Sequence, residues 1–563
     1  MRQRRETEAA GTYLAQAVQQ IQAGRLADAA LTLRSILADA PHDARALGLL
    51  STATLRAGRA REATELARRA VALAPDDPPA LAALATATAA IGETAAAITA
   101  WRRAIARAPG LATAHCNLGL LLLGRKAASE AFAACDTALR LDPSLAAARL
   151  NRGLAAINLG RLEEGEADLR AVLPAMLDSV DVWVGLGVAR RRMGRHGEAT
   201  AALEQAIRLD PRHAGALNNL GRVHRATGEY DQAIACFDRA LELSPDFEDA
   251  RWNRAVSNLL AGRLAEAWED HEARWRLPGM DPHPSYPAPV WQGGPIEGRT
   301  ILLSPEQGLG DAIQFARYAP LLAARGARVV LGIRPELKQV IRGLDGVAAL
   351  VAPGDPLPPI DCFCPLMSLP RAFRTELRSI PAAVPYLRAE PSAVTRWQRV
   401  LSSEPGLSVG VVWAGNPKHA NDHNRSLSLP ALAGLAAVPG VRLFSLQVGP
   451  RAVEAAAWPA LTDLSPRLTD FAETAAALSV LDLLVTVDTS IAHLAGALAR
   501  PVWIMLAHEP DWRWMAKRDD SPWYPTARLF RQKRFGDWSG PVGEIEAALS
   551  TLARRPAATP VLA

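Results

Sequence analysis

Residues 305–315, PEQGLGDAIQF, combine a tight turn with an acidic residue at the start of a helical pattern. They follow a short apolar run, and Gly308 and Gly310 let the backbone turn sharply before a helix opens at Asp311. A carboxylate at this point can accept a proton from an attacking hydroxyl group, as a general base does. Asp is also a frequent helix N-cap, a role worth about 1 kcal/mol, so the segment alone leaves Asp311 as a base or a cap.

A second segment, VDTSIAHLAGAL (487–498), begins where another apolar run stops at an acidic residue. Thr489 and His493 are four residues apart, which puts them on one face of the helix that follows. Free amides at a helix N-terminus bind anions, and the hydroxyls of Thr489 and Ser490 add donors. Asp488 suits a sugar hydroxyl better than a phosphate, so the segment predicts a nucleotide-sugar site. The alternative is an ordinary strand-to-helix turn with Asp488 as its cap.

A polar loop, WAGNPKHANDHNRS (413–426), lies between these two segments in the sequence. It could supply positive charge and amide donors to the phosphates of a bound nucleotide. The residues concerned are Asn416, Lys418, His419 and Arg425. A basic loop is equally often a solvated surface loop, so both interpretations stay open.

Two further features fall in the same part of the chain. Glu473, at the start of a helical pattern, could bind a ribose, although a helix-surface Glu fits it as well. The segment EPDWRWMAKRDDSPWYP (509–525) holds three Trp residues beside Arg513. These indoles could stack on a base or a sugar, or they could be core residues between two lobes.

The composition describes an ordinary folded protein with more than one domain. The chain has 563 residues, of which 49% are hydrophobic and 21% charged, and its formal net charge is +5. This small charge argues against a nucleic-acid binder, and no apolar run is long enough for a transmembrane segment. The five Cys residues show neither a disulfide framework nor a paired zinc pattern. We therefore expect no metal site and a reducing, cytoplasmic location.

The first half of the chain repeats itself every 34 residues. Gly recurs at residues 24, 58, 92, 160, 194, 228 and 262, and Lys126 alone interrupts the column. A left-handed residue there ends one helix, further columns of small residues let paired helices approach, and a Pro column stops the second helix. The pattern resembles the tetratricopeptide repeat. It predicts an all-α solenoid of about eight helix–turn–helix units over residues 8–277.

One repeat position carries Asn in four of the units. Its members are Asn117, Asn151, Asn219 and Asn253. First helices line the groove of such a solenoid, so these amides could form a ladder that binds an extended peptide backbone. Tetratricopeptide-containing protein O-glycosyltransferases, which this arrangement resembles, use such a ladder for their substrates. The alternative is that Asn is simply common at this repeat position.

The second half of the chain alternates between strand and helix patterns. It follows a Pro- and Gly-rich linker, residues 278–298, which Trp291 is expected to anchor. The alternation predicts two Rossmann-like lobes with parallel sheets, one over residues 299–390 and one over 391–555. Ligands of such sheets bind beyond the carboxyl ends of the strands, where both polar segments fall.

Together, the GLGD and DTSIAHLA motifs resemble glycosyltransferase family 9, the heptosyltransferases of the GT-B fold. The resemblance implies inverting, metal-free sugar transfer, and the absence of D-x-D in residues 276–563 agrees with it. It implies that Asp311 is the base, that Asp488 contacts the donor sugar and that Thr489 contacts the diphosphate, with His493 as the helix histidine. Ser490 departs from the small residue usual there, a lysine near the phosphates has no certain counterpart, and heptosyltransferases lack a repeat array.

These observations predict a multidomain protein, an all-α tetratricopeptide solenoid followed by an α/β GT-B fold. We expect sugar transfer from a nucleotide-sugar, which is a co-substrate, so that no cofactor is expected. The repeats would bind the acceptor, a protein or a glycan, in their groove. Two alternatives stay open: a transferase for a lipid or polysaccharide acceptor, and a non-catalytic scaffold whose second half only senses a nucleotide-sugar.

Overall fold

The computed structural model describes residues 2–279, 283–306, 308–401, 405–419 and 421–554. The chain forms two compact units, Met1–Asn219 and Leu220–Ala563. Three parts of the predicted elements lie outside the described residues: 280–282 of the linker, Ala420 of the polar loop, and residues from 555 onward, where the predicted second lobe ends. Among the described residues, none of the helices combines the length and apolarity needed to cross a membrane.

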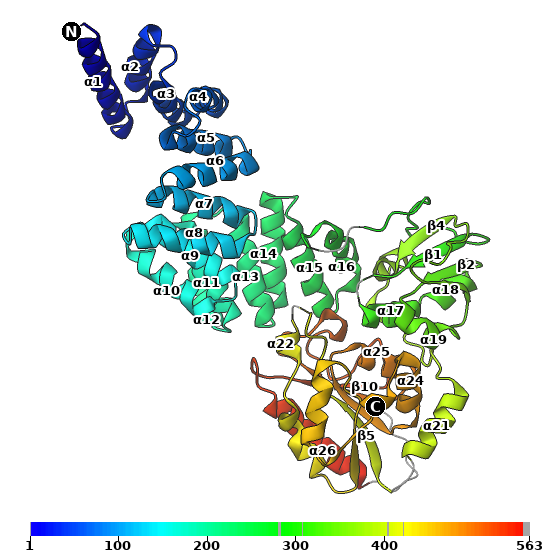
Figure 1. Ribbon diagram of the computed structural model, residues 1–563. Helices are drawn as coiled ribbons and strands as arrows, with labels where there is room; N and C mark the ends of the chain where they lie inside the picture. The colour runs from blue at the N-terminus through cyan, green and yellow to red at the C-terminus, as the bar shows by residue number, and fades with distance from the viewer. Residues whose placement is uncertain (1, 280–282, 307, 402–404, 420, 555–563) are drawn as a thin grey trace. The chain divides into compact units, whose positions relative to one another are not determined.

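The first half of the chain is helical throughout its described part and confirms the predicted tetratricopeptide solenoid (Figure 1). The helices are α1 (Arg2–Gln22), α2 (Leu26–Asp39), α3 (Ala44–Arg56), α4 (Ala60–Leu73), α5 (Pro78–Ala90), α6 (Thr94–Arg107), α7 (Ala112–Gly124), α8 (Ala128–Leu141), α9 (Ala146–Asn158), α10 (Leu162–Val172), α11 (Val180–Arg192), α12 (His196–Leu209), α13 (Ala214–Ala226), α14 (Tyr230–Leu243), α15 (Glu248–Leu260) and α16 (Leu264–His271).

The Gly column ends the first helix of each pair, as its spacing predicts. Every Gly of the column has a positive φ, between 74° and 83°, which only Gly adopts without strain. The chain then closes the helix end with backbone bonds, such as the one from Arg25 N to Gln20 O at 2.9 Å. Lys126, which interrupts the column, adopts the same left-handed conformation with φ of 60°.

The small-residue column lets the two helices of a repeat touch. A Cβ added to Gly119 would lie 2.3 Å from the Cys135 sulfur, and one added to Gly187 would lie 2.5 Å from Leu203 Cγ. Both distances are shorter than any real contact, so α7 packs on α8, and α11 on α12, only because these positions lack a side chain.

The first α/β lobe is built on a four-stranded parallel sheet. Its strands are β1 (Thr300–Ser304), β2 (Arg328–Gly332), β3 (Val347–Val351) and β4 (Cys362–Pro365), in the order β3-β2-β1-β4. The linker pairs with its edge, because Trp291 N donates to Phe363 O at 2.7 Å, and the Trp291 ring is buried. The helices of this lobe are α17 (Leu309–Ala316), α18 (Ala319–Ala324), α19 (Lys338–Ile341) and α20 (Leu369–Ala372).

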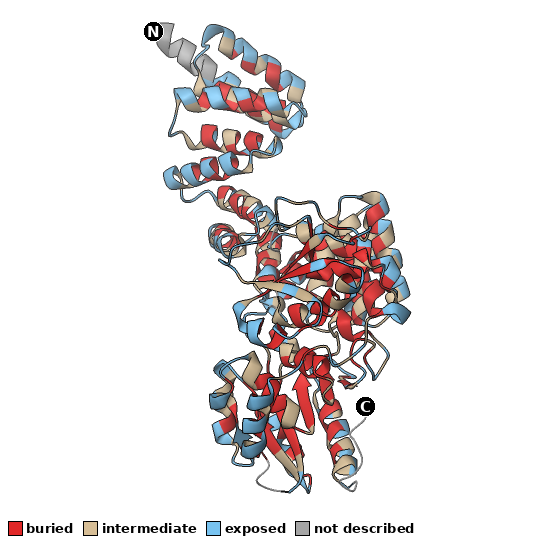
Figure 2. Cartoon of the chain, turned by 90° about the vertical axis from the view of Figure 1, so that its right-hand side faces the viewer, coloured by how far each residue is buried: buried red, intermediate tan, exposed pale blue. Residues whose placement is uncertain are grey.

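The second lobe holds a six-stranded parallel sheet in the order β10-β9-β8-β5-β6-β7. Its strands are β5 (Leu407–Val412), β6 (Val441–Ser445), β7 (Leu461–Asp463), β8 (Leu483–Val487), β9 (Val502–Leu506) and β10 (Ala527–Arg531). Its helices are α21 (Pro391–Leu401), α22 (Asp422–Arg425), α23 (Ala433–Ala436), α24 (Phe471–Val480), α25 (Ser490–Ala497) and α26 (Ser539–Ala553). The two parallel sheets confirm the α/β class, and Figure 2 shows the buried residues concentrated in them.

The largest hydrophobic core joins the last repeat to both lobes. Leu260 and Trp268 of the last repeat, Phe315 of the first lobe, and Leu494 and Trp512 of the second lobe belong to this one cluster. Burial of apolar surface contributes roughly 25 cal/mol per Å², so this shared core stabilises the contacts of the last repeat with both lobes.

Substitution of Lys126 by Gly tests the role of the Gly column. A left-handed conformation costs a non-Gly residue about 1–2 kcal/mol, and Gly at this position removes that cost. The greater freedom of Gly in the unfolded chain offsets part of the gain. We expect Lys126→Gly to raise the free energy of unfolding of the repeats by about 0.5–1 kcal/mol, measured by urea denaturation. Lys126→Ala, the control, should give no such gain, and a lower midpoint for Lys126→Gly would contradict the assignment.

Candidate functional site

The two polar segments contact each other directly. Gly310, in the first turn of α17, faces the first turns of α25: a Cβ at Gly310 would lie 2.8 Å from His493 Cδ2 and 3.6 Å from Ser490 Cα. The Gly at position 310 therefore allows the two helices, from different lobes, to approach this closely.

Asp311 has two partners in the structure. Its Oδ2 accepts a hydrogen bond from Gly308 N at 3.1 Å, which closes the turn before α17. Its Oδ1 forms an ion pair with the Arg513 guanidinium of the second lobe. The carboxylate is partly exposed, with 20% of the side chain accessible. Asp311 is therefore not the N-cap that the sequence offered as an alternative: Gly308 is the N-cap, and Asp311 is the third residue of α17. Its carboxylate closes the turn and also faces the second lobe.

Arg513 lies between two carboxylates. It is buried, its Nη1 donates to Asp511 Oδ1 at 2.8 Å, and its guanidinium lies 4.4 Å from the centre of the Trp512 ring. Burial acts to lower the pKa of Arg513, but Asp311 and Asp511 outweigh it and raise the pKa, so the cation is stable. The spacing of the sequence does not reveal this ion pair, because its partners are 202 residues apart.

Asp488 and Asp511 differ in protonation because of their surroundings. Burial raises the pKa of Asp488 to about 6, and the nearby charge of Asp511 adds to this effect. Burial also acts to raise the pKa of Asp511, but Arg513 outweighs it and holds that pKa below its usual value. Asp488 therefore takes up a proton more readily than Asp511 near neutral pH.

Among the described residues, no side chain caps the start of α25. Thr489 is the N-cap residue in an extended conformation, and its side chain does not cap the helix. The Thr489 hydroxyl instead lies 3.3 Å from the Thr486 hydroxyl. The first amides of the helix carry partial positive charge, and Ser490 beside them is partly exposed.

The polar loop reaches this turn through one of its residues. Arg425 Nη1 donates to the Asp488 carbonyl at 3.2 Å, and Arg425 Nε donates to Asp422 Oδ1 at the same distance. Asn416 and Lys418 lie on the exposed part of the loop, where Asn416 Oδ1 accepts from Lys418 N at 3.0 Å. Arg425 is thus beside the Asp488 turn, whereas the side chains of the other two face solvent.

His493 is a buried residue in this structure. Its Nδ1 lies 3.0 Å from the Tyr524 hydroxyl, and its ring stacks on Trp514 at a centroid distance of 5.2 Å. Burial, reinforced by the charge of Arg513, lowers the pKa of His493 to about 3, so the imidazole is neutral near pH 7. The three indoles of the Trp-rich segment, Trp512, Trp514 and Trp523, are also buried, which favours the core interpretation of that segment.

Glu473, in the first turn of α24, contacts α21. Its carboxylate accepts from Trp397 Nε1 at 2.8 Å and forms an ion pair with Arg396. Its backbone N–H donates to Asp470 Oδ1 at 2.8 Å, because Asp470 caps α24. These interactions of Glu473 are those of a helix–helix contact, and a role in ribose binding stays a prediction.

The four Asn residues of the repeat column lie in first helices, as expected. Asn151 Nδ2 lies 3.7 Å from the Cys116 sulfur, Asn219 Nδ2 donates to Gly215 O at 2.9 Å, and Asn253 Oδ1 accepts from Arg225 Nη1 at 2.9 Å. Asn117 is half-buried. Three of the amides thus make contacts within the chain, so a peptide would have to compete for them or use their remaining groups.

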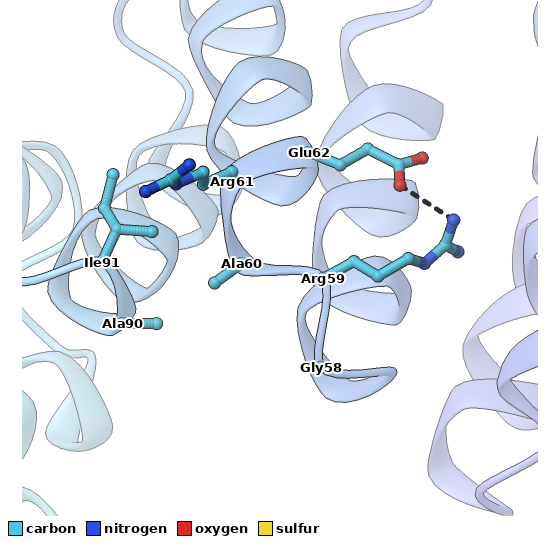
Figure 3. A pocket seen from close by; sticks show the side chains of 7 residues that line it. All are labelled: Gly58, Arg59, Ala60, Arg61, Glu62, Ala90 and Ile91. Atoms are coloured by element: carbon cyan, nitrogen blue, oxygen red, sulfur yellow. Dashed lines mark hydrogen bonds and ion pairs between the residues drawn. The ribbon is translucent and has the colours of Figure 1, made fainter.

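A hollow of about 530 Å³ lies on the repeats, lined by residues 58–62, Ala90 and Ile91 (Figure 3). It contains none of the candidate residues, and its walls are helix ends and a surface ion pair between Arg59 and Glu62. Within the described part of the chain, no group of three or more His, Cys, Asp or Glu is arranged to hold a metal ion.

Comparisons with known families agree with both halves of the chain. Residues 20–87, 82–146, 184–246 and 219–287 match tetratricopeptide repeats. Residues 451–515 match glycosyltransferase family 9 (heptosyltransferase), and this range includes the Asp488–His493 segment and Arg513.

Similarity to individual proteins is more distant. Protein FlbA of Caulobacter vibrioides is 26% identical over 339 residues, which is 55% of this chain. The match spans 56% of the length of that relative, or about half of it. Solved structures similar to part of the chain include the APC/C hetero-tetramer Cut9–Hcn1, with a TM-score of 0.38, 18% identity and coverage of 44% of this chain and 48% of that one. A tetratricopeptide repeat protein from Parabacteroides merdae has a TM-score of 0.35 and 19% identity, and covers 44% of this chain and 99% of its own.

Substitution of His493 by Gln tests its burial as a neutral ring. The unfolded chain protonates this His near pH 6.5, whereas the folded chain does so only near pH 3, so the folded state loses stability as pH falls between these values. Gln keeps hydrogen-bonding groups but cannot titrate. We expect the free energy of unfolding of His493→Gln to decrease less steeply with falling pH, by about 1 kcal/mol per pH unit, in urea denaturation from pH 7 to pH 4. His423→Gln, at an exposed position, is the control, and an unchanged slope in His493→Gln would contradict the burial.

The 34-residue pattern and the paired helices that it predicts characterise the first half of the chain. The two parallel sheets and the Asp488–His493 turn characterise the second half. The chain carries tetratricopeptide repeats in its first half and a C-terminal α/β region, of which residues 451–515 are similar to glycosyltransferase family 9.

Proposed function

We propose that the α/β region transfers a sugar from a nucleotide-sugar to a hydroxyl group, with inversion and without a metal ion. The observation that carries the proposal is the contact between the Gly308–Asp311 turn and the Asp488–His493 segment. The Gly308–Asp311 turn carries a partly exposed carboxylate, and the Asp488–His493 segment contains the start of a helix with Arg425 beside it. A base on one side and an anion site on the other are the two parts that such a displacement needs.

In the proposed reaction, the acceptor oxygen attacks C1 of the donor sugar and passes its proton to Asp311. The bond from C1 to the phosphate oxygen breaks at the same time, and the nucleoside diphosphate leaves. Each carboxylate oxygen has two lone pairs, so Asp311 can accept this proton while it keeps its contacts with Gly308 and Arg513. The configuration at C1 is inverted because attack and departure occur on opposite faces.

The negative charge that develops on the leaving diphosphate is met at the start of α25. The free amides there, the Thr489 and Ser490 hydroxyls and Arg425 are the donors. Lys418 and Asn416 would reach the phosphates from the exposed part of the loop. Asp488 carries a raised pKa and binds a sugar hydroxyl, because a group that shares a proton readily can donate or accept there.

We further propose that the repeats bring the acceptor to this site and that the acceptor is a protein. Solenoids of this kind offer a long concave surface, and the Asn column runs along their first helices. The second candidate function is a nucleotide-sugar sensor without turnover. The ion pair between Asp311 and Arg513 favours it, because Arg513 covers one oxygen of the carboxylate that would act as the base.

Substitution of Asp311 by Asn separates these two functions. Asn keeps the shape and can still accept from Gly308 N, but it cannot act as a base. After nucleotide-sugars are screened for thermal stabilisation of the full chain, we expect Asp311→Asn to lower kcat by about 10²–10⁴-fold and to leave binding of the donor unchanged. Asp355→Asn, a carboxylate on the surface of the same lobe that pairs with Lys338, is the control. Full activity in Asp311→Asn would rule out the assigned base.

Replacement of the four column Asn residues by Ala tests the acceptor. Each lost hydrogen bond is worth about 0.5–1.5 kcal/mol, so the quadruple variant should raise the KM for a protein acceptor by at least about tenfold, with the KM for the donor unchanged. Asn158→Ala, at an exposed position of α9 outside the column, is the control. Equal transfer to protein by wild type and variant would contradict the ladder, and transfer to a glycolipid alone would contradict the protein acceptor.

A further inference from the structure

The last repeat sends a buried arginine into the first α/β lobe. Arg274 lies in η2 (Glu272–Arg276), directly after α16, and only 3% of its side chain is exposed. Its Nε donates to Glu306 Oε2 at 2.9 Å, its Nη1 to Glu272 Oε1 at 2.7 Å, and its Nη2 to Ser368 Oγ at 2.7 Å. One guanidinium therefore binds the last repeat and two segments of the first lobe together.

Glu306, the partner of Arg274, stands at the start of the Gly-rich turn. It lies five residues before Asp311, its Oε1 accepts from Met367 N at 2.8 Å, and its side chain is 4% exposed. Burial raises the pKa of Glu306, and the charge of Asp311 acts in the same direction, which puts the two carboxylates within electrostatic reach. Arg274 is the cation that balances this buried carboxylate.

A second contact of the last repeat reaches the other partner of Asp311. In α16, Trp268 and His271 pack edge-on against Trp512, with ring centroids 5.8 Å and 5.7 Å away. Trp512 in turn lies under the guanidinium of Arg513, which pairs with Asp311. Ala516 N also donates to Leu260 O at 2.9 Å, so the segment that carries Arg513 is bonded to the end of α15.

We propose that the last repeat is a positioning element of the transferase site, and that Arg274 is a positioning residue for Asp311. It fixes the start of the Gly-rich turn through Glu306, while the Trp512 stack fixes Arg513 on the other side of the carboxylate. The importance of the Asp311 position for catalysis rests on the proposed function of Asp311. The structural coupling of the last repeat to the Gly-rich turn does not depend on that function. Consequently, the α/β region requires residues 248–276 in order to hold its site, and a fragment that begins after the linker would lose this support.

Hydrogen exchange of the full chain tests the coupling without any knowledge of the donor. In Arg274→Met, we expect the amides of residues 303–316 to exchange about tenfold faster, while β8 keeps its protection. Arg274→Lys keeps the charge but not the fork, and should recover part of the protection. Arg276→Met is the matched control: this neighbouring arginine pairs with Glu248 at the surface and should leave the exchange of the turn unchanged.

The double variant Arg274→Met/Glu306→Gln covers the case in which a lone buried Glu306 unfolds the lobe. It removes both charges, so we expect it to fold and still to exchange fast in residues 303–316. Unchanged exchange of this turn in both the single and the double variant, or a rise spread equally over β8 in the double variant, would overturn the proposal.

Turnover adds a readout that a merely structural contact would not give. Once a donor has been identified, we expect the double variant to have a kcat lower by about tenfold or more. The rise in melting temperature caused by the nucleoside diphosphates UDP, GDP, ADP and CDP should be unchanged. If Asp311→Asn retains full activity while exchange in the turn still rises, the proposed base is wrong and the coupling stands. If Asp311→Asn is inactive and the turn of the Arg274 variants keeps wild-type exchange, the base stands and the coupling is wrong.

Discussion

The arrangement of the α/β region depends on the close approach of Gly310 to α25. A side chain at this position would collide with His493, so the two helices can meet only because Gly stands there. This approach brings Asp311 to Arg513 and puts the Gly-rich turn beside the start of α25. A neutral His493, fixed by Tyr524 and Trp514, gives the approach a rigid surface. The chemistry proposed for the region therefore rests on a contact that is purely steric.

Electrostatics then divide the roles among the carboxylates around Arg513. Asp511 stays ionised beside the buried guanidinium, Asp488 has a raised pKa because burial outweighs its cationic neighbours, and Asp311 remains partly open to solvent. The last repeat supports this cluster from outside, through Arg274 on one side and Trp512 on the other. The final unit of the repeat array is packed into the core of the α/β region.

Local patterns in the sequence predicted most of the fold and singled out the segments around Asp311 and His493, which the structure brings together. Period and turn chemistry revealed the solenoid, and even the exception at Lys126 adopts the conformation of the column. The strands at 300–304 and 483–487 were recognisable as apolar runs, whereas β3, β7 and β10 were not anticipated. The Asp311–Arg513 and Arg274–Glu306 pairs join residues far apart in the chain, and no local pattern encodes such a pair. The four-residue spacing likewise placed Thr489 and His493 on one helix face, but it does not reveal that other side chains cover His493, which is buried.

The central claim is that the donor diphosphate binds at the start of α25. A crystal structure of the full chain, soaked with the nucleoside diphosphate that stabilises it most, tests this directly. The account predicts density for the two phosphates within hydrogen-bond distance of the Ser490 and Ile491 amides, with Arg425 beside them. A diphosphate bound elsewhere in the chain, with the start of α25 filled only by solvent, would contradict it.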